Sequence, residues 1–152
     1  MSLTHLRTPV WRQRLALFAL VIGSLLVGIW ADVSVGRKPD YLDLRTAVIA
    51  FLLSWVPAEM ARNAINTGLH VQPRFARWVR AAVIGIISVA IAYALPAFIS
   101  SLIVFPAVMA QLGLSFLADI AMGLVLTLQQ ALIPTLVIGS LSGVVAAWVV
   151  AL

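Results

Sequence analysis

The carboxyl-terminal half of the chain is almost free of charge. From Ala81 to Leu152 it runs for 72 residues with one ionisable side chain, Asp119. Soluble domains carry a charge on about a quarter of their residues, whereas over all 152 residues this chain is 63% hydrophobic and 10% charged. We therefore predict a protein whose solvent is lipid.

The apolar runs divide the chain into five predicted transmembrane helices, since about 20 residues cross the hydrocarbon of a bilayer. We place them at about residues 15–31, 46–66, 78–104, 113–129 and 133–152. Pro96 is expected to kink or end the third helix, and Pro134 suits the first turn of the last helix, where no N–H is needed. The predicted fold is an all-α integral membrane protein, a single domain over residues 1–152, in a compact bundle. An alternative with four spans stays open, in which part of 97–112 is re-entrant or lies in the interface.

Clusters of basic residues orient these spans. One side receives seven of them in the predicted topology, namely Arg7, Arg12, Arg14, Arg62, Arg74, Arg77 and Arg80. The other side receives Arg37, Lys38 and Arg45. Because basic loops stay in the cytoplasm, we predict a cytoplasmic amino terminus in a bacterial inner membrane. Five spans would put the carboxyl terminus outside, and four would put it inside.

The net charge of +5 has two possible explanations. Without a nucleic-acid recognition motif it does not indicate nucleic-acid binding. Short basic clusters beside apolar runs are instead typical of contacts with phospholipid headgroups. We expect such contacts from Arg74, Arg77, Trp78 and Arg80.

The segment from residue 50 to 106 carries an order of features that hydropathy alone would not produce. An aliphatic run, Ala50-Phe51-Leu52-Leu53-Ser54, leads to Ile65-Asn66-Thr67-Gly68-Leu69, then to Phe75-Ala76-Arg77-Trp78-Val79-Arg80-Ala81, and then to a second run with Ala92 and Pro96. In this order it resembles a small bacterial family of uncharacterised membrane proteins, a domain of unknown function that is usually a two-helix hairpin. The resemblance implies a topology and no activity. Glu59 departs from it, because an acid is not expected in the family's first helix.

Asp119 is the sharpest candidate for a functional side chain. A carboxylate in the middle of an apolar span costs a few kcal/mol on insertion scales, and such groups usually face a cavity, a partner charge or an ion path. Asp119 could therefore bind a proton or a cation in a small transporter. Alternatively it is neutral, or pairs with Arg62 or with a basic group of a partner subunit, and serves packing alone.

A polar stripe marks the end of the second predicted helix. It consists of Glu59, Arg62, Asn63 and Asn66. Offsets of three, four and seven residues place these side chains on one helix face and allow an ion pair between Glu59 and Arg62. A gate or relay would use such a pair. We favour a helix end at the headgroup level, where Arg62 reaches lipid phosphate and the asparagines cap or bridge.

Small residues recur every four positions on the last predicted helix. They are Gly139, Gly143, Ala147 and Ala151, and we call them the small-residue ridge. Such ridges let helix backbones approach closely in lipid, where no hydrophobic effect drives helices together. We predict that the ridge packs against another helix of the same chain, with dimerisation or docking on a larger complex as the alternative.

No catalytic motif accompanies these features. The chain has no cysteine, and its two histidines, His5 and His70, lie outside the predicted spans. We expect neither catalysis nor a metal or cofactor. The predicted function is that of a non-enzymatic accessory or structural subunit, in contact with lipid and with other membrane subunits or copies of itself. The alternative is a small oligomeric transporter or channel for an ion or small solute that uses Asp119 and the face of Glu59 and Arg62.

Overall fold

The chain folds into helices throughout the part that the structure describes. In the computed structural model this part comprises residues 9–36, 38–39, 44–68, 73–113 and 115–151. It contains five helices, which are α1 (Val10–Ser34), α2 (Leu44–Gly68), α3 (Arg74–Leu112), α4 (Ser115–Gln130) and α5 (Leu132–Ala151). The prediction of an all-α protein is confirmed. Four of the helices, α1, α2, α3 and α5, hold an apolar segment of 20 to 25 residues that is long enough to cross a membrane.

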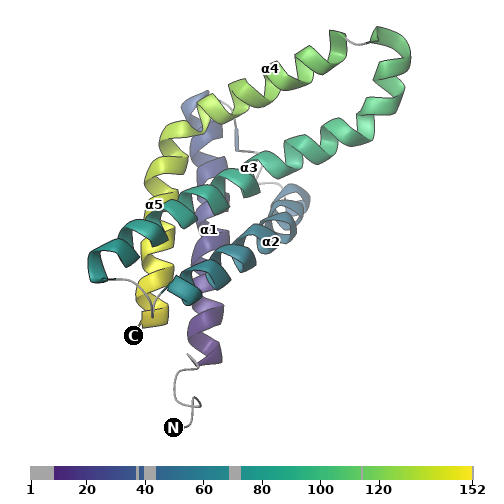
Figure 1. Ribbon diagram of the computed structural model, residues 1–152. Coiled ribbons are helices and arrows are strands. Elements are labelled where there is room, and N and C mark those ends of the chain that lie inside the picture. Colours follow the sequence, from purple (N-terminus) through teal and green to yellow (C-terminus); the bar gives the residue numbers. More distant parts are fainter. Residues whose placement is uncertain (1–8, 37, 40–43, 69–72, 114, 152) are drawn as a thin grey trace.

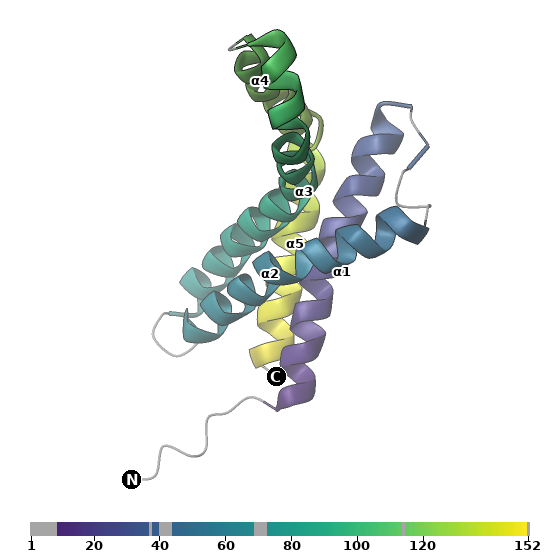
Figure 2. The same ribbon diagram turned by 90° about the vertical axis from the view of Figure 1, so that its right-hand side faces the viewer.

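These four helices pack together with alternating direction (Figures 1 and 2). α1 and α5 lie antiparallel, and α2 and α3 form a second antiparallel pair that crosses the first. One core cluster joins the first half of α1, the end of α2, the start of α3 and the end of α5, through residues such as Leu20, Ala58, Ala81 and Ala147. A second cluster joins the far half of α1, the middle of α3 and the start of α5, through Val27, Val89 and Ala131. The first residues of α1 and the last residues of α5 therefore lie at the same end of the bundle.

Glycines bring α3 and α5 into backbone contact. A Cβ atom on Gly143 would overlap the carbonyl oxygen of Ala81, and one on Gly85 would overlap that of Gly139. A Cβ atom on Gly139 would lie 2.8 Å from the Cα atom of Ile86. The small-residue ridge of α5 thus lies against α3, which is the kind of close helix approach that small residues allow in lipid.

α3 continues beyond this bundle. It passes through Pro96 and Pro106 and ends at Leu112, which makes it 39 residues long, whereas the sequence predicted an end near residue 104. Gly113 follows with a φ of +66°, a left-handed conformation that favours glycine, and α4 returns beside α3 towards α5 (Figure 1). We call residues 97–130 the α3–α4 hairpin.

The α3–α4 hairpin is the part that differs from the predicted compact five-span bundle. The turn at Gly113 divides the apolar stretch after Pro96 into two helical pieces, residues 97–112 and 115–130. Each piece has 16 residues, which is shorter than the about 20 residues that a membrane span needs. The helices thus fit the four-span alternative, although residues 97–112 extend α3 instead of forming a separate element.

Candidate functional sites at the basic end and on the hairpin

Arginines from three helices gather at one end of the bundle, which we call the basic end. α1 and α3 begin there, and α2 and α5 end there (Figure 1). It carries Arg12, Arg14, Arg62, Arg74, Arg77 and Arg80. Lys38, which follows α1, and Arg45, in the first turn of α2, lie towards the opposite end. Arg7 and Arg37, which the predicted topology also uses, lie outside the described residues.

Arg62 is the centre of a hydrogen-bonded network at the basic end. Its Nε atom donates to Oε2 of Glu59 at 3.0 Å, and its Nη2 atom forms the ion pair with Oε1 of the same carboxylate. Nη2 also donates to Oδ1 of Asn63 at 2.9 Å. Nη1 reaches α1 and donates to Oε1 of Gln13 at 2.5 Å. With 14% of its side chain exposed, Arg62 has its donors directed to protein acceptors, and the network ties α2 to α1.

The structure therefore brings three of the four stripe residues into contact and adds one that the sequence did not indicate. Asn66 is half-buried one turn further along the same face. Gln13 is the residue that sequence reasoning missed. A glutamine between two arginines in the first turn of an apolar helix was the available signal, but its partner lies 49 residues away.

Asp119 lies apart from this network. It is exposed on α4, on the same helix face as Met122 and Leu126, which are apolar and also exposed. Arg62 is paired with Glu59, so the expected pairing of Asp119 with Arg62 is not formed. Asp119 thus lies on the α3–α4 hairpin and not in the core of the bundle. A role for Asp119 in binding stays a prediction.

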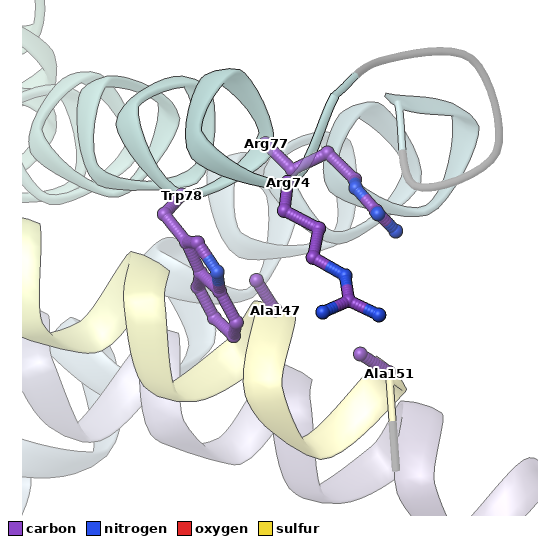
Figure 3. Close-up of a pocket in the computed structure, with 5 residues that line it drawn as sticks. All are labelled: Arg74, Arg77, Trp78, Ala147 and Ala151. Carbon is purple, nitrogen blue, oxygen red and sulfur yellow. The ribbon is translucent and has the colours of Figure 1, made fainter.

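Two of the hollows between the helices are lined by residues that the structure describes. The smaller, of about 190 Å³, opens at the basic end and is lined by Arg74, Arg77 and Trp78 from α3 and by Ala147 and Ala151 from α5 (Figure 3). We call it the arginine cavity. Arg80, which was predicted to share these headgroup contacts, is half-buried one turn further along α3 and is not among the lining residues.

The larger hollow, of about 370 Å³, is a groove between α2 and α3. Its walls are apolar apart from Ser88, and Pro57 lies in the α2 wall. The hydroxyl oxygen of Ser88 is buried and has no hydrogen-bond partner. A groove with one polar atom offers little to orient a polar solute.

No protein-family model matches the chain, and neither does a curated protein or a solved structure. The resemblance of residues 50–106 to a two-helix family therefore stays a prediction. Within the described part, no three His, Asp or Glu side chains lie close enough together to hold a metal ion. His5 and His70 lie outside the described residues. The helices define the class: a polytopic membrane protein with four candidate spans.

Proposed function

We propose that this protein is a non-enzymatic accessory subunit of a membrane assembly, and that its α3–α4 hairpin binds another membrane protein. The observation that carries the proposal is the position of Asp119. This carboxylate is exposed on an apolar helix that lies outside the four-helix bundle. A charged side chain on an apolar helix is costly in lipid unless it meets a partner group or water.

The chemistry of Asp119 specifies what the partner presents. An apolar transmembrane surface would cover Met122 and Leu126, which share the helix face of Asp119 and are 61% and 49% exposed. One basic or hydrogen-bond-donating side chain within that surface would pair with the carboxylate. The bundle then serves as the anchor that holds the hairpin in the membrane.

The interior of the bundle supports an anchoring role over a transport role. Two buried hydroxyl groups there bond to their own helices: Ser24 donates to the carbonyl of Leu20 at 3.0 Å, and Ser54 donates to that of Phe51 at 2.9 Å. A pathway for ions or solutes needs polar groups that line it and are free to exchange partners. The polar side chains of the Arg62 network are instead bonded to one another at one end.

Site-specific photo-crosslinking in the native membrane tests the proposal. A photoreactive amino acid at Met122 on α4 is compared with one at Ile22 on α1, which is also apolar and exposed. We expect an adduct with one defined membrane protein from position 122 and none from position 22. Asp119→Asn should reduce that adduct at least fivefold, because it keeps the size of the side chain and removes its charge.

Purification in a gentle detergent provides the second readout. Recovery of the same partner at a fixed stoichiometry, lost in Asp119→Asn, would support an accessory subunit. A homo-oligomer that catalyses ion or solute flux in liposomes, with flux lost in Asp119→Asn, would contradict the proposal and establish the transporter. An adduct of equal yield from positions 122 and 22 would also contradict it.

A further inference from the structure

The arginine cavity combines positive charge with the space to hold a small anionic group. Figure 3 shows one of the two arginine side chains reaching from α3 towards Ala151 on α5 and the other pointing away from α5, while the Trp78 indole lies against α5 near Ala147. The floor is formed by Ala147 and Ala151, whose side chains end at Cβ. The last two members of the small-residue ridge therefore leave room where larger side chains would fill the space.

The charged side chains that line this cavity are positive. Two guanidinium groups line it, and Arg80 follows on the next turn of α3. The planar donor forks of arginine match the geometry of a phosphate group, which can accept two parallel hydrogen bonds from each.

The size of the cavity limits the ligand. Its volume of about 190 Å³ is below the range of roughly 300–1,000 Å³ that is typical of pockets for small molecules and cofactors. A phosphate group with part of its attached headgroup fits such a space. A whole cofactor does not, so the rest of the ligand must lie outside the cavity.

The surfaces next to the cavity are suited to hydrocarbon. Phe75 precedes the lining residue Trp78 by three positions on α3 and is 81% exposed, and Trp148 precedes the lining residue Ala151 by three positions on α5 and is 55% exposed. A ligand whose phosphate occupies the cavity could lay acyl chains along these side chains. Tryptophan at this level is also typical of the interface between hydrocarbon and water.

We propose that the arginine cavity binds the phosphate of one anionic phospholipid, with Arg74 and Arg77 as its ligands and Trp78 against its glycerol region. This site is independent of the partner proposed for the α3–α4 hairpin. It differs from general attraction to a charged membrane surface, because other arginines at the basic end do not line the cavity. Arg14 is such a residue, exposed on the first turn of α1, and it provides the matched control.

Lipid titration of the purified full-length chain in detergent, followed by native mass spectrometry, tests this site. The probe is phosphatidylglycerol, with phosphatidylcholine as the zwitterionic comparison. We expect one phosphatidylglycerol to bind at least fivefold more tightly than phosphatidylcholine. Combined Arg74→Gln and Arg77→Gln substitutions should weaken phosphatidylglycerol at least tenfold, and Arg14→Gln should change it less than twofold.

A second variant tests the space in the cavity without changing its charge. Ala151→Phe fills the floor and leaves both arginines in place, so it should also weaken phosphatidylglycerol at least fivefold. The thermal unfolding of each variant in detergent identifies any that fails to fold, and Ala151→Phe then carries the test alone if the arginine variant is the one that fails.

Soluble phosphates distinguish a lipid from a free anion as the ligand. Inorganic phosphate and glycerol phosphate at millimolar concentration should leave the bound phosphatidylglycerol in place, because they lack acyl chains. Displacement by either at the concentration at which phosphatidylglycerol itself competes would overturn the assignment to a lipid. Equal weakening by Arg14→Gln and by the double arginine variant would show that only the general surface charge matters, and would overturn the site.

Discussion

The four-helix bundle and the α3–α4 hairpin are built from equally apolar sequence but have different surroundings. In the bundle, Gly85, Gly139 and Gly143 each meet backbone atoms of a neighbouring helix at 3.0 Å or less from an added Cβ. In α4, a Cβ atom added to Gly123 meets nothing within 4 Å. Hydropathy therefore indicates which segments enter lipid, whereas the environment of the glycines indicates which of them pack against each other.

The strongest test of this difference replaces one glycine in each region by alanine. Gly143→Ala places a Cβ atom on the carbonyl of Ala81, so α3 and α5 must separate. We expect the free energy of unfolding to fall by about 3 kcal/mol, the upper part of the range for overpacked cores. Gly123→Ala should leave it unchanged or raise it by up to about 1 kcal/mol, since alanine is the better helix former. Unfolding in mixed micelles, followed by circular dichroism, measures both.

The Arg62 network provides the next largest effect, because it crosses between two helices of the bundle. Arg62→Gln removes the donors to Glu59 and Gln13 and leaves their oxygens without this partner. We expect a loss of about 1–3 kcal/mol in the free energy of unfolding. Arg14→Gln, on the exposed surface of α1, should stay within about 0.5 kcal/mol. Equal effects of the two substitutions would show that the network does not connect α1 and α2 in the membrane.

Substitution of Ser88 tests a buried polar group inside the bundle, and its expected effect on the free energy of unfolding is smaller. Its hydroxyl is buried without a partner, whereas that of Ser54 donates to the carbonyl of Phe51. Ser88→Ala should raise the free energy of unfolding by about 1 kcal/mol, because it removes an unsatisfied polar group. Ser54→Ala should not raise it. A loss on Ser88→Ala would indicate that the hydroxyl has a partner from the lipid or another subunit.

Asp119 should show the smallest effect on the isolated chain. It is exposed on α4, so Asp119→Asn should change the free energy of unfolding by less than about 0.5 kcal/mol, even though it is expected to abolish partner binding. The same micelle titration measures it. A loss above about 1 kcal/mol would mean that α4 packs into the bundle and that the two regions are not separate.

Hydropathy and charge were enough to predict the helices that cross the bundle. The predicted spans at 15–31, 46–66 and 133–152 lie within or next to α1, α2 and α5, because each is bounded by charged or turn-forming residues. Pro134 also lies in the first turn of α5, where its missing N–H is tolerated. These features depend on local sequence, and local sequence was sufficient for them.

The features that were missed depend on tertiary structure. Pro96 left a kink or an end open, and α3 does not end there, since proline is tolerated in helices in lipid when other groups satisfy the freed carbonyl. Asp119 was singled out because it is a charged residue within an apolar run. The exposure of its side chain follows from the position of α4 outside the bundle. The bond between Arg62 and Gln13 joins residues 49 positions apart, and no local pattern specifies such a pair.

The place of α5 between α1 and α3 also has a consequence for biosynthesis. α5 is the last of the five helices to leave the ribosome, and it packs against both earlier helices. Until Gly139 and Gly143 are inserted, the backbone of α3 near Gly85 lacks its contacts with them. The core thus closes only after α5 has been inserted, because α5 supplies the contacts with both earlier helices. A nascent chain that stalls before Leu132 would hold an unfinished core, which membrane quality-control proteases could recognise.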